Sequence, residues 1–316
     1  MSAFLLKRLA SFVATLVCAS LVIFLVLEVL PGNAAEVILG PEAPPETVAA
    51  LAKKLGVDRP PLARYLGWVE GMAEGDFGTS YAYGTPAASL IDQSLALTIP
   101  LALIAMALNT VLGLALGIFA ASRHNRFGDV AVMALSQIGI AIPSFWFAIL
   151  LILLFAVGLG WLPAGGFPGW SAGLWPGLRA LILPAVSLAI VQSAILARVT
   201  RSAVLDVLRE DFVRTARAKG LGEGQALRRH VLRNAMIPIV TIMGLQFSNL
   251  LVLTIVVENV FYLPGLGRLI LNSIANRDVV VVRDVVMLLA AMVVAVNFAV
   301  DLLYAAIDPR LKLRDL

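Results

Sequence analysis

The sequence predicts an all-α membrane protein with six transmembrane helices and a long insert between the first two. Hydrophobic residues make up 60% of the 316 residues, only 14% are charged, and the mean hydropathy is +0.93. A soluble core of this length could not bury so much apolar surface. The apolar residues also gather in uncharged stretches close to the roughly 20 residues that a helix needs to cross a bilayer.

The first predicted span lies within residues 1–30 and contains the uncharged run 9–27. This run follows Lys7 and Arg8, as in a signal peptide, but it exceeds the roughly 7 to 15 residues of a signal core and lacks a clear cleavage site. We therefore expect a retained anchor helix. The other spans are predicted at about 93–122, 130–157, 180–200, 234–260 and 280–307, followed by a tail at 308–316.

Two segments between spans have a composition of their own. Residues 161–177 are rich in Gly and Pro and hold three Trp, which is typical of a loop at the membrane surface. The insert, residues 31–92, is too long for a simple link. Within it, 45–56 and 61–72 have helical character and 77–86 is rich in turn residues. The insert either covers the outer mouth or contacts a partner, and these two interpretations are compatible.

The distribution of Lys and Arg predicts the orientation. With a cytoplasmic N-terminus, the segments around 123–126, 198–233 and 310–314 are inside and rich in Arg, whereas the cations of the insert are offset by Asp and Glu. The bias of cations to the inside then places both termini and a loop at 201–233 in the cytoplasm.

The cytoplasmic loop has an internal pattern beyond its charge. No Gly or Pro occurs from 201 to 219, where Val204, Leu208, Phe212 and Ala216 recur at every fourth residue and predict one helix with an apolar stripe. Glycines at 220, 222 and 224 should break it, and 225–233 predicts a second short helix before the next span. A helix, a turn and a helix form a docking element for a partner. The alternative is a plain topology anchor that attracts anionic lipid.

Several functions are poorly supported by the sequence. The cations are not interleaved with exposed aromatics, so nucleic-acid binding is not expected. Cys18 stands alone and offers no disulfide, redox pair or metal cluster. No lysine sits in the Gly-x-x-x-x-Gly-Lys-Ser/Thr loop that holds nucleotide phosphates, so any ATPase must be another polypeptide. Hydrolase motifs are absent as well, and we expect neither catalytic nor metal-binding residues.

The stretch RTARAKGL at 214–221 resembles the cytoplasmic signature of permease subunits of binding-protein-dependent ABC importers, in the dipeptide and oligopeptide permease family. The similarity covers nearly the whole chain, because further blocks follow in family order: LGVDRPPLARYL (55–66), GDFGTSY (75–81), IAIPSFWFAILLILLF (140–155), RNAMIPI (233–239), ENVFYLPGLGRLI (258–270) and DLLYAAIDPRLK (301–312). The broader importer pattern carries Glu-Ala-Ala where this chain has Arg214, Thr215 and Ala216, a substitution that the peptide branch tolerates.

The resemblance implies a type I ABC importer fold in the bacterial inner membrane. It also implies these partners: a homologous second permease, two ATP-binding subunits that use ATP and Mg, an external substrate-binding protein, and membrane lipid. In this family the cytoplasmic elbow docks in a cleft of the ATPase and transmits its closure. The coupling residues are then Arg214, Thr215, Ala216, Arg217, Ala218, Lys219, Gly220 and Leu221.

The transported ligand is less well defined. Gln246 and Asn249 are candidate lining residues for a hydrated path, because neutral amides suit a polar peptide backbone or a helix contact better than an ion relay. Peptide import is the leading hypothesis. Import of nickel, an oligosaccharide or a peptide-like conjugate remains open. A stand-alone secondary transporter would need internal repeats and a charged intramembrane relay, and neither is found.

Overall fold

The computed structural model describes residues 2–29, 35, 39–40, 43–56 and 58–307, and almost all of them are helical. Within these residues the one β-type pairing is an isolated bridge between Thr79 and Pro86, so the all-α prediction is confirmed. The chain divides into two compact units. The first consists of 99–263 and the segment from 296 onward, and the second consists of 2–98 and 264–295.

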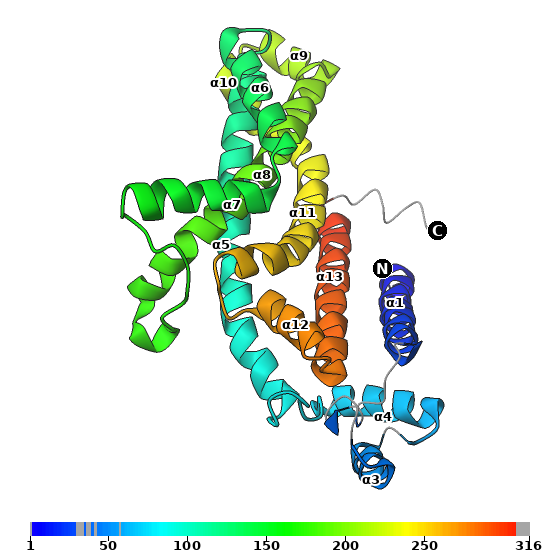
Figure 1. The fold of residues 1–316 in the computed structure, drawn as a ribbon. Coiled ribbons are helices and arrows are strands. Elements are labelled where there is room, and N and C mark those ends of the chain that lie inside the picture. Colours follow the sequence, from blue (N-terminus) through cyan, green and yellow to red (C-terminus); the bar gives the residue numbers. More distant parts are fainter. Residues whose placement is uncertain (1, 30–34, 36–38, 41–42, 57, 308–316) are drawn as a thin grey trace. The chain divides into compact units, whose positions relative to one another are not determined.

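The first unit contains the later part of α5 (Ala87–Ser122), followed by α6 (Phe127–Ala141), α7 (Ser144–Leu151), the π-helical η1 (Ile152–Gly158), the short η2 (Trp170–Ala172) and α8 (Leu174–Leu208). It continues with α9 (Asp211–Ala218), α10 (Glu223–Ala226), the π-helical η3 (Leu227–Val231) and α11 (Leu232–Val260). The last part of α13 (Val279–Ile307) also belongs to it. Figure 1 shows α8 running through this unit beside α5, α6 and α11.

Glycines let α5 and α8 approach closely within the first unit. A side chain at Gly113 would collide with Leu196, since a Cβ placed there would lie 2.7 Å from that side chain. One turn later, a Cβ at Gly117 would meet Thr200 at 2.5 Å. Small residues at this spacing let helices associate in a membrane, where no hydrophobic effect drives them together. Consequently Leu196 and Thr200 are fully buried.

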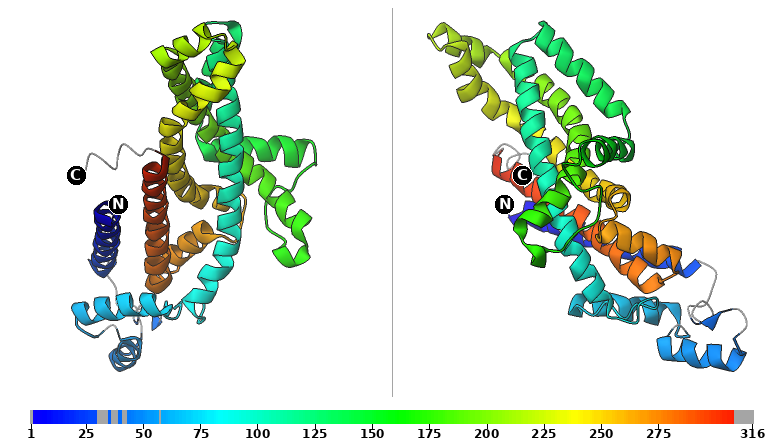
Figure 2. Two further views of the ribbon diagram at one scale, coloured as in Figure 1. Left: turned by 180° about the vertical axis from the view of Figure 1, so that it is seen from behind. Right: turned by 60° about the vertical axis from the view of Figure 1, so that its left-hand side comes forward.

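The span predicted at 130–157 is not a continuous helix. It breaks after Ala141, where Ile142 and Pro143 adopt extended backbone conformations, and α7 leaves α6 at an angle of 101°. Both views in Figure 2 show this change of direction. The residue before a proline is disfavoured in the helical region, so the break at Ile142 falls where it costs least in this span.

The second unit contains α1 (Ser2–Val29), α3 (Pro45–Leu55), α4 (Pro61–Glu74), the start of α5, α12 (Leu266–Ala275) and the start of α13. The helices expected in the insert at 45–56 and 61–72 are confirmed as α3 and α4. Each begins with proline in its first turn and ends at a glycine with positive φ, Gly56 at 69° and Gly75 at 82°. This is the usual asymmetry of proline at the start and glycine at the end of a helix.

Buried polar contacts tie α4 to α13, and the 76–86 segment to Asp278 just before α13, inside the second unit. Trp68 Nε1 donates to Asp284 Oδ1 at 2.7 Å, and the Arg283 guanidinium lies 4.7 Å from the centre of the Trp68 ring. Ser80 Oγ donates to Asp278 Oδ2 at 2.5 Å. Both aspartates are fully buried. The insert is therefore packed against other parts of its unit and is more than a loose connection.

Among the described residues, five helices are long and apolar enough to cross a membrane, and the bent pair α6 and α7–η1 makes a sixth if it counts as one span. The predicted number of six agrees with this count. The sequence interpretation missed α12, a ten-residue apolar helix between the last two spans. Its first residue, Leu266, is anchored by its backbone N–H, which donates to Thr98 Oγ1 at 2.9 Å within the second unit.

Candidate functional site

The elbow, which we define as residues 209–231, follows directly on α8. One helix was expected from 201 to 219, but α8 ends at Leu208 and a new helix, α9, starts at Asp211. The four apolar residues of the predicted stripe therefore do not lie on one continuous helix. Phe212 is 43% exposed, whereas its neighbour Val213 is 1% exposed and lies in an apolar cluster with Val204, Val231 and Ile239. The break changes the helical phase, so Val213 takes the inward position.

Gly220 closes α9 in the manner predicted. Its φ is +95°, and the N–H groups of Gly220 and Leu221 donate to the carbonyls of Arg217 at 2.9 Å and Ala216 at 3.3 Å. These two bonds form the Schellman motif, in which a residue with positive φ lets the chain cap the last carbonyls of a helix. Apart from its chain neighbours, no heavy atom of the described residues would lie within 4 Å of a Cβ on Gly220. Within the described residues, position 220 therefore favours glycine because of its positive φ and not because a side chain would collide.

The return arm of the elbow differs from the prediction. A separate helix was expected at 225–233, but α10 runs into η3, and η3 runs into α11 without interruption. Pro238 lies inside α11 and does not open it. An exposed ion pair joins the two arms, with Arg217 Nη2 at 2.7 Å from Glu223 Oε1. Exposed pairs of this kind contribute little stability. The buried apolar cluster holds the elbow instead.

The eight predicted coupling residues lie together on α9 and its closing turn. Most of them are exposed: Arg214, Thr215, Arg217, Ala218, Lys219 and Gly220. Ala216 and Leu221 are half-buried. This segment thus presents a polar, basic surface with Phe212 at its edge, on a short helix that Val213 anchors from beneath. Another protein could contact this surface without any change in the fold of α9.

An ion pair that the sequence interpretation missed lies near the elbow. The Arg201 guanidinium donates to both oxygens of Asp129, Nε to Oδ1 at 2.5 Å and Nη2 to Oδ2 at 2.7 Å. The N–H of Asn125 donates to Oδ2 at 2.9 Å, and His124 Nδ1 lies 3.4 Å from the same oxygen. Asp129 is buried, so α8 is fixed to the turn between α5 and α6. The sequence offered one signal for this contact, the carboxylate of Asp129 directly before the uncharged run that starts at 130.

The two candidate path residues of α11 differ in exposure. Gln246 is 3% exposed, and its amide accepts from Asn109 Nδ2 at 3.0 Å and donates to the Gln192 carbonyl at 2.8 Å. Gln246 therefore joins α5, α8 and α11 within this chain. Asn249 is exposed among the exposed apolar residues of α11. Its position leaves it available to a partner or to a path, and the assignment of both residues to a path stays a prediction.

Comparisons with known proteins agree with this architecture. Residues 113–313 match the family described as "Binding-protein-dependent transport system inner membrane component", and residues 1–102 match the N-terminal part of such membrane components. A Brucella abortus (strain 2308) protein named for a peptide transport system permease is 39% identical over 312 residues, 99% of each chain. The glutathione transport system permease protein GsiC of Salmonella choleraesuis (strain SC-B67) is 40% identical over 309 residues, 98% of each chain.

Solved structures show the same fold. An inward-facing structure of the MetNI methionine ABC transporter aligns with 69% of this chain and 96% of its own, at a TM-score of 0.58 and 20% identity. An amino acid ABC transporter aligns with 69% and 94%, at a TM-score of 0.53 and 18% identity. At these identities the likeness concerns the fold alone. Together with the full-length relatives, it shows that the chain belongs to the family of binding-protein-dependent transport system inner membrane components and is a multi-pass permease subunit of an ABC importer.

Proposed function

We propose that this chain forms half of a translocation path for di- or oligopeptides, delivered by an extracytoplasmic binding protein. Relatives at about 40% identity over the full chain carry the names of a peptide permease and a glutathione permease, which supports a peptide or peptide-like ligand. The exposed Asn249 on α11 supplies a polar side chain of the kind that such a path needs.

The elbow is the observation on which the coupling role rests. Six of its eight coupling residues are exposed, on a helix that is anchored by the buried Val213 and closed by Gly220. In our proposal this surface docks on one of two ATP-binding subunits, and a homologous second permease completes the path. Both termini and the elbow then face the cytoplasm. The chain itself contains no nucleotide-binding loop. In our proposal the partner ATPase therefore binds ATP with Mg and hydrolyses it, and this chain is not catalytic.

Substitution of Gly220 tests the coupling role. Gly220→Val places a β-branched residue at positive φ, which costs about 1–2 kcal/mol in the elbow. Gly220→Asn is the matched control, because Asn tolerates this conformation. Among the described residues, a Cβ at that position meets no atom within 4 Å, so effects beyond the strain report on the partner. We expect Gly220→Val to reach the membrane but to lose uptake and the stimulation of ATP hydrolysis by loaded binding protein.

The control separates two causes. If Gly220→Asn couples normally, conformational strain alone explains the loss of coupling in Gly220→Val. If Gly220→Asn also uncouples, the ATPase approaches the backbone too closely for any side chain. Normal substrate-stimulated ATPase activity in Gly220→Val would show that the elbow is only a topology anchor, and the coupling proposal would be wrong.

The ligand class needs a separate measurement. Uptake of a labelled tripeptide by cells expressing the complete importer should be competed by glutathione and by other short peptides. Competition by nickel or an oligosaccharide, with none by peptides, would support the non-peptide alternative and refute peptide import. This result would leave the coupling test unaffected.

Topology is tested by introduced thiols in a Cys18→Ala background. Lys53→Cys should react with an impermeant thiol reagent in intact cells, because the insert is proposed to lie outside. Arg217→Cys should react only after permeabilisation. The reverse pattern would overturn the orientation.

A further inference from the structure

A pocket of about 650 Å³ lies between the loop at 160–168 and the first turns of α8, within the first unit. Its walls are largely apolar and include Leu162, Pro163, Phe167 and Trp175. Arg179 is the one charged residue among its lining residues. An apolar hollow with a single cation at its edge fits a ligand that combines a negative group with a hydrocarbon part.

The position of Arg179 is fixed by the protein itself. Its Nη2 donates to the Trp161 carbonyl at 2.7 Å, and this bond uses one of the five guanidinium N–H groups. Within the described chain no carboxylate pairs with Arg179, and it is the only charged residue from 130 to 197. The remaining donors therefore face the pocket region without a counter-charge.

The loop that forms the other wall is a defined structure. The Gly166 N–H donates to the Phe261 carbonyl at 2.8 Å, at the end of α11. Gly165 lies so close to the same carbonyl oxygen that no side chain fits there. Trp161 and Trp175 are 62% and 68% exposed. Exposed tryptophans beside an apolar span are typical of the membrane–water interface.

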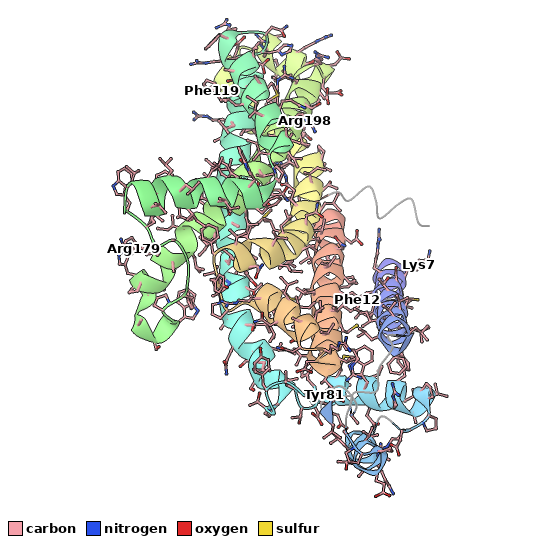
Figure 3. The ribbon with its side chains drawn as sticks, viewed as in Figure 1. Lys7, Phe12, Tyr81, Phe119, Arg179 and Arg198 are labelled. Atoms are coloured by element: carbon pink, nitrogen blue, oxygen red, sulfur yellow. The ribbon has the colours of Figure 1, made fainter. Side chains whose placement is uncertain are left out.

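The spacing of charges along α8 gives the depth of the pocket. Arg179 precedes Arg198 by 19 residues without any charge between them. At about 1.5 Å per residue this corresponds to about 28 Å, close to the roughly 30 Å of the hydrocarbon core. With Arg198 at one membrane surface, Arg179 lies among the lipid headgroups of the opposite leaflet. Figure 3 shows the two residues far apart along the first unit, with Arg198 toward the elbow.

From these observations we propose that the pocket binds an anionic phospholipid, whose phosphodiester accepts hydrogen bonds from Arg179 while its glycerol and upper acyl chain lie against the apolar and aromatic wall. Guanidinium groups suit phosphate because several N–H donors lie in one plane. The negative lipid supplies the counter-charge that the chain does not provide near Arg179.

The test uses the importer purified from membranes through a tag on this chain, with its partner subunits retained. Native mass spectrometry counts the lipids kept after delipidation and addition of phosphatidylglycerol. Arg179→Gln should lose one phosphatidylglycerol per chain, or hold it about tenfold more weakly, as expected for one charge-assisted hydrogen bond. Arg59→Gln, an exposed cation of the insert, is the control and should keep it. Arg179→Lys keeps the charge but not the planar set of donors, so its retention should lie between those of the unchanged protein and of Arg179→Gln.

Two further arms identify the source of the phosphate. Phosphatidylcholine should bind more weakly than phosphatidylglycerol, and inorganic phosphate at equal concentration should not displace the lipid. Unchanged lipid retention in Arg179→Gln, equal retention of both lipids, or displacement by inorganic phosphate would each overturn the proposal. If Arg179→Gln does not assemble, Trp175→Ala takes its place, and unchanged retention in that variant would overturn the proposal as well.

Discussion

Replacing Arg201 should destabilise the chain more than replacing its ion-pair partner Asp129. The Asp129 side chain is 3% exposed and that of Arg201 is 23% exposed. Arg201→Met therefore leaves a nearly inaccessible carboxylate without its partner, at the usual cost for a buried pair of about 3–5 kcal/mol. Asp129→Asn leaves a guanidinium that water partly reaches, so we expect about 1–3 kcal/mol.

The assay is thermal unfolding of the purified chain in detergent, followed by tryptophan fluorescence. Arg201→Met should lower the Tm by on the order of 10 °C and Asp129→Asn by a few degrees. Arg198→Met, on the same helix but exposed, should change it little. The double variant Asp129→Asn, Arg201→Met should lose less than the sum of the single variants. Strictly additive losses would refute a direct interaction between the two side chains.

Two further substitutions test buried polar contacts, and a third tests an exposed polar residue of α11. Trp68→Phe keeps an aromatic ring but removes the N–H that donates to Asp284, whose other carboxylate oxygen has no hydrogen-bond partner among the described residues. The free energy of unfolding should fall by about 1–3 kcal/mol, and an unchanged Tm would contradict the contact. Gln246→Leu should lower the Tm, because it removes two buried hydrogen bonds, one from Asn109 Nδ2 and one to the Gln192 carbonyl; an unchanged Tm would contradict their contribution. Asn249→Leu should leave the Tm unchanged and reduce uptake; unaffected uptake would remove Asn249 from the path.

The sequence predicts the helices well because their signals are local. Long uncharged runs specify the spans, and prolines and glycines specify the ends of α3 and α4. Proline is less informative inside an apolar run. Pro100, Pro184 and Pro238 all lie within continuous helices, whereas Pro143 accompanies a bend of 101°. The difference depends on packing around each proline, which the sequence does not contain.

The site is predicted less completely, because its contacts join distant residues. The helix-ending turn at Gly220 was predicted correctly, since a left-handed turn after a helix favours glycine locally, whereas its role in coupling stays a prediction. Val213 was missed because a break at 209–210 changes the phase of the helix, and a periodic pattern cannot reveal such a change in advance. Asp129 and Arg201 are 72 residues apart. In the sequence each looks like any other charged residue beside a span, so the pairing was missed.

The two arms of the elbow are attached to the membrane helices by joints of different stiffness. On one side, α10, η3 and α11 form uninterrupted helical backbone, as Figure 2 shows in yellow and green. On the other side, Arg209 and Glu210 separate α8 from α9 and can absorb changes in backbone angles. A displacement applied to the elbow should therefore turn the start of α11 while α8, fixed by Asp129, stays still. If the ATPase docks on the elbow as proposed, its push would become torque on α11 alone.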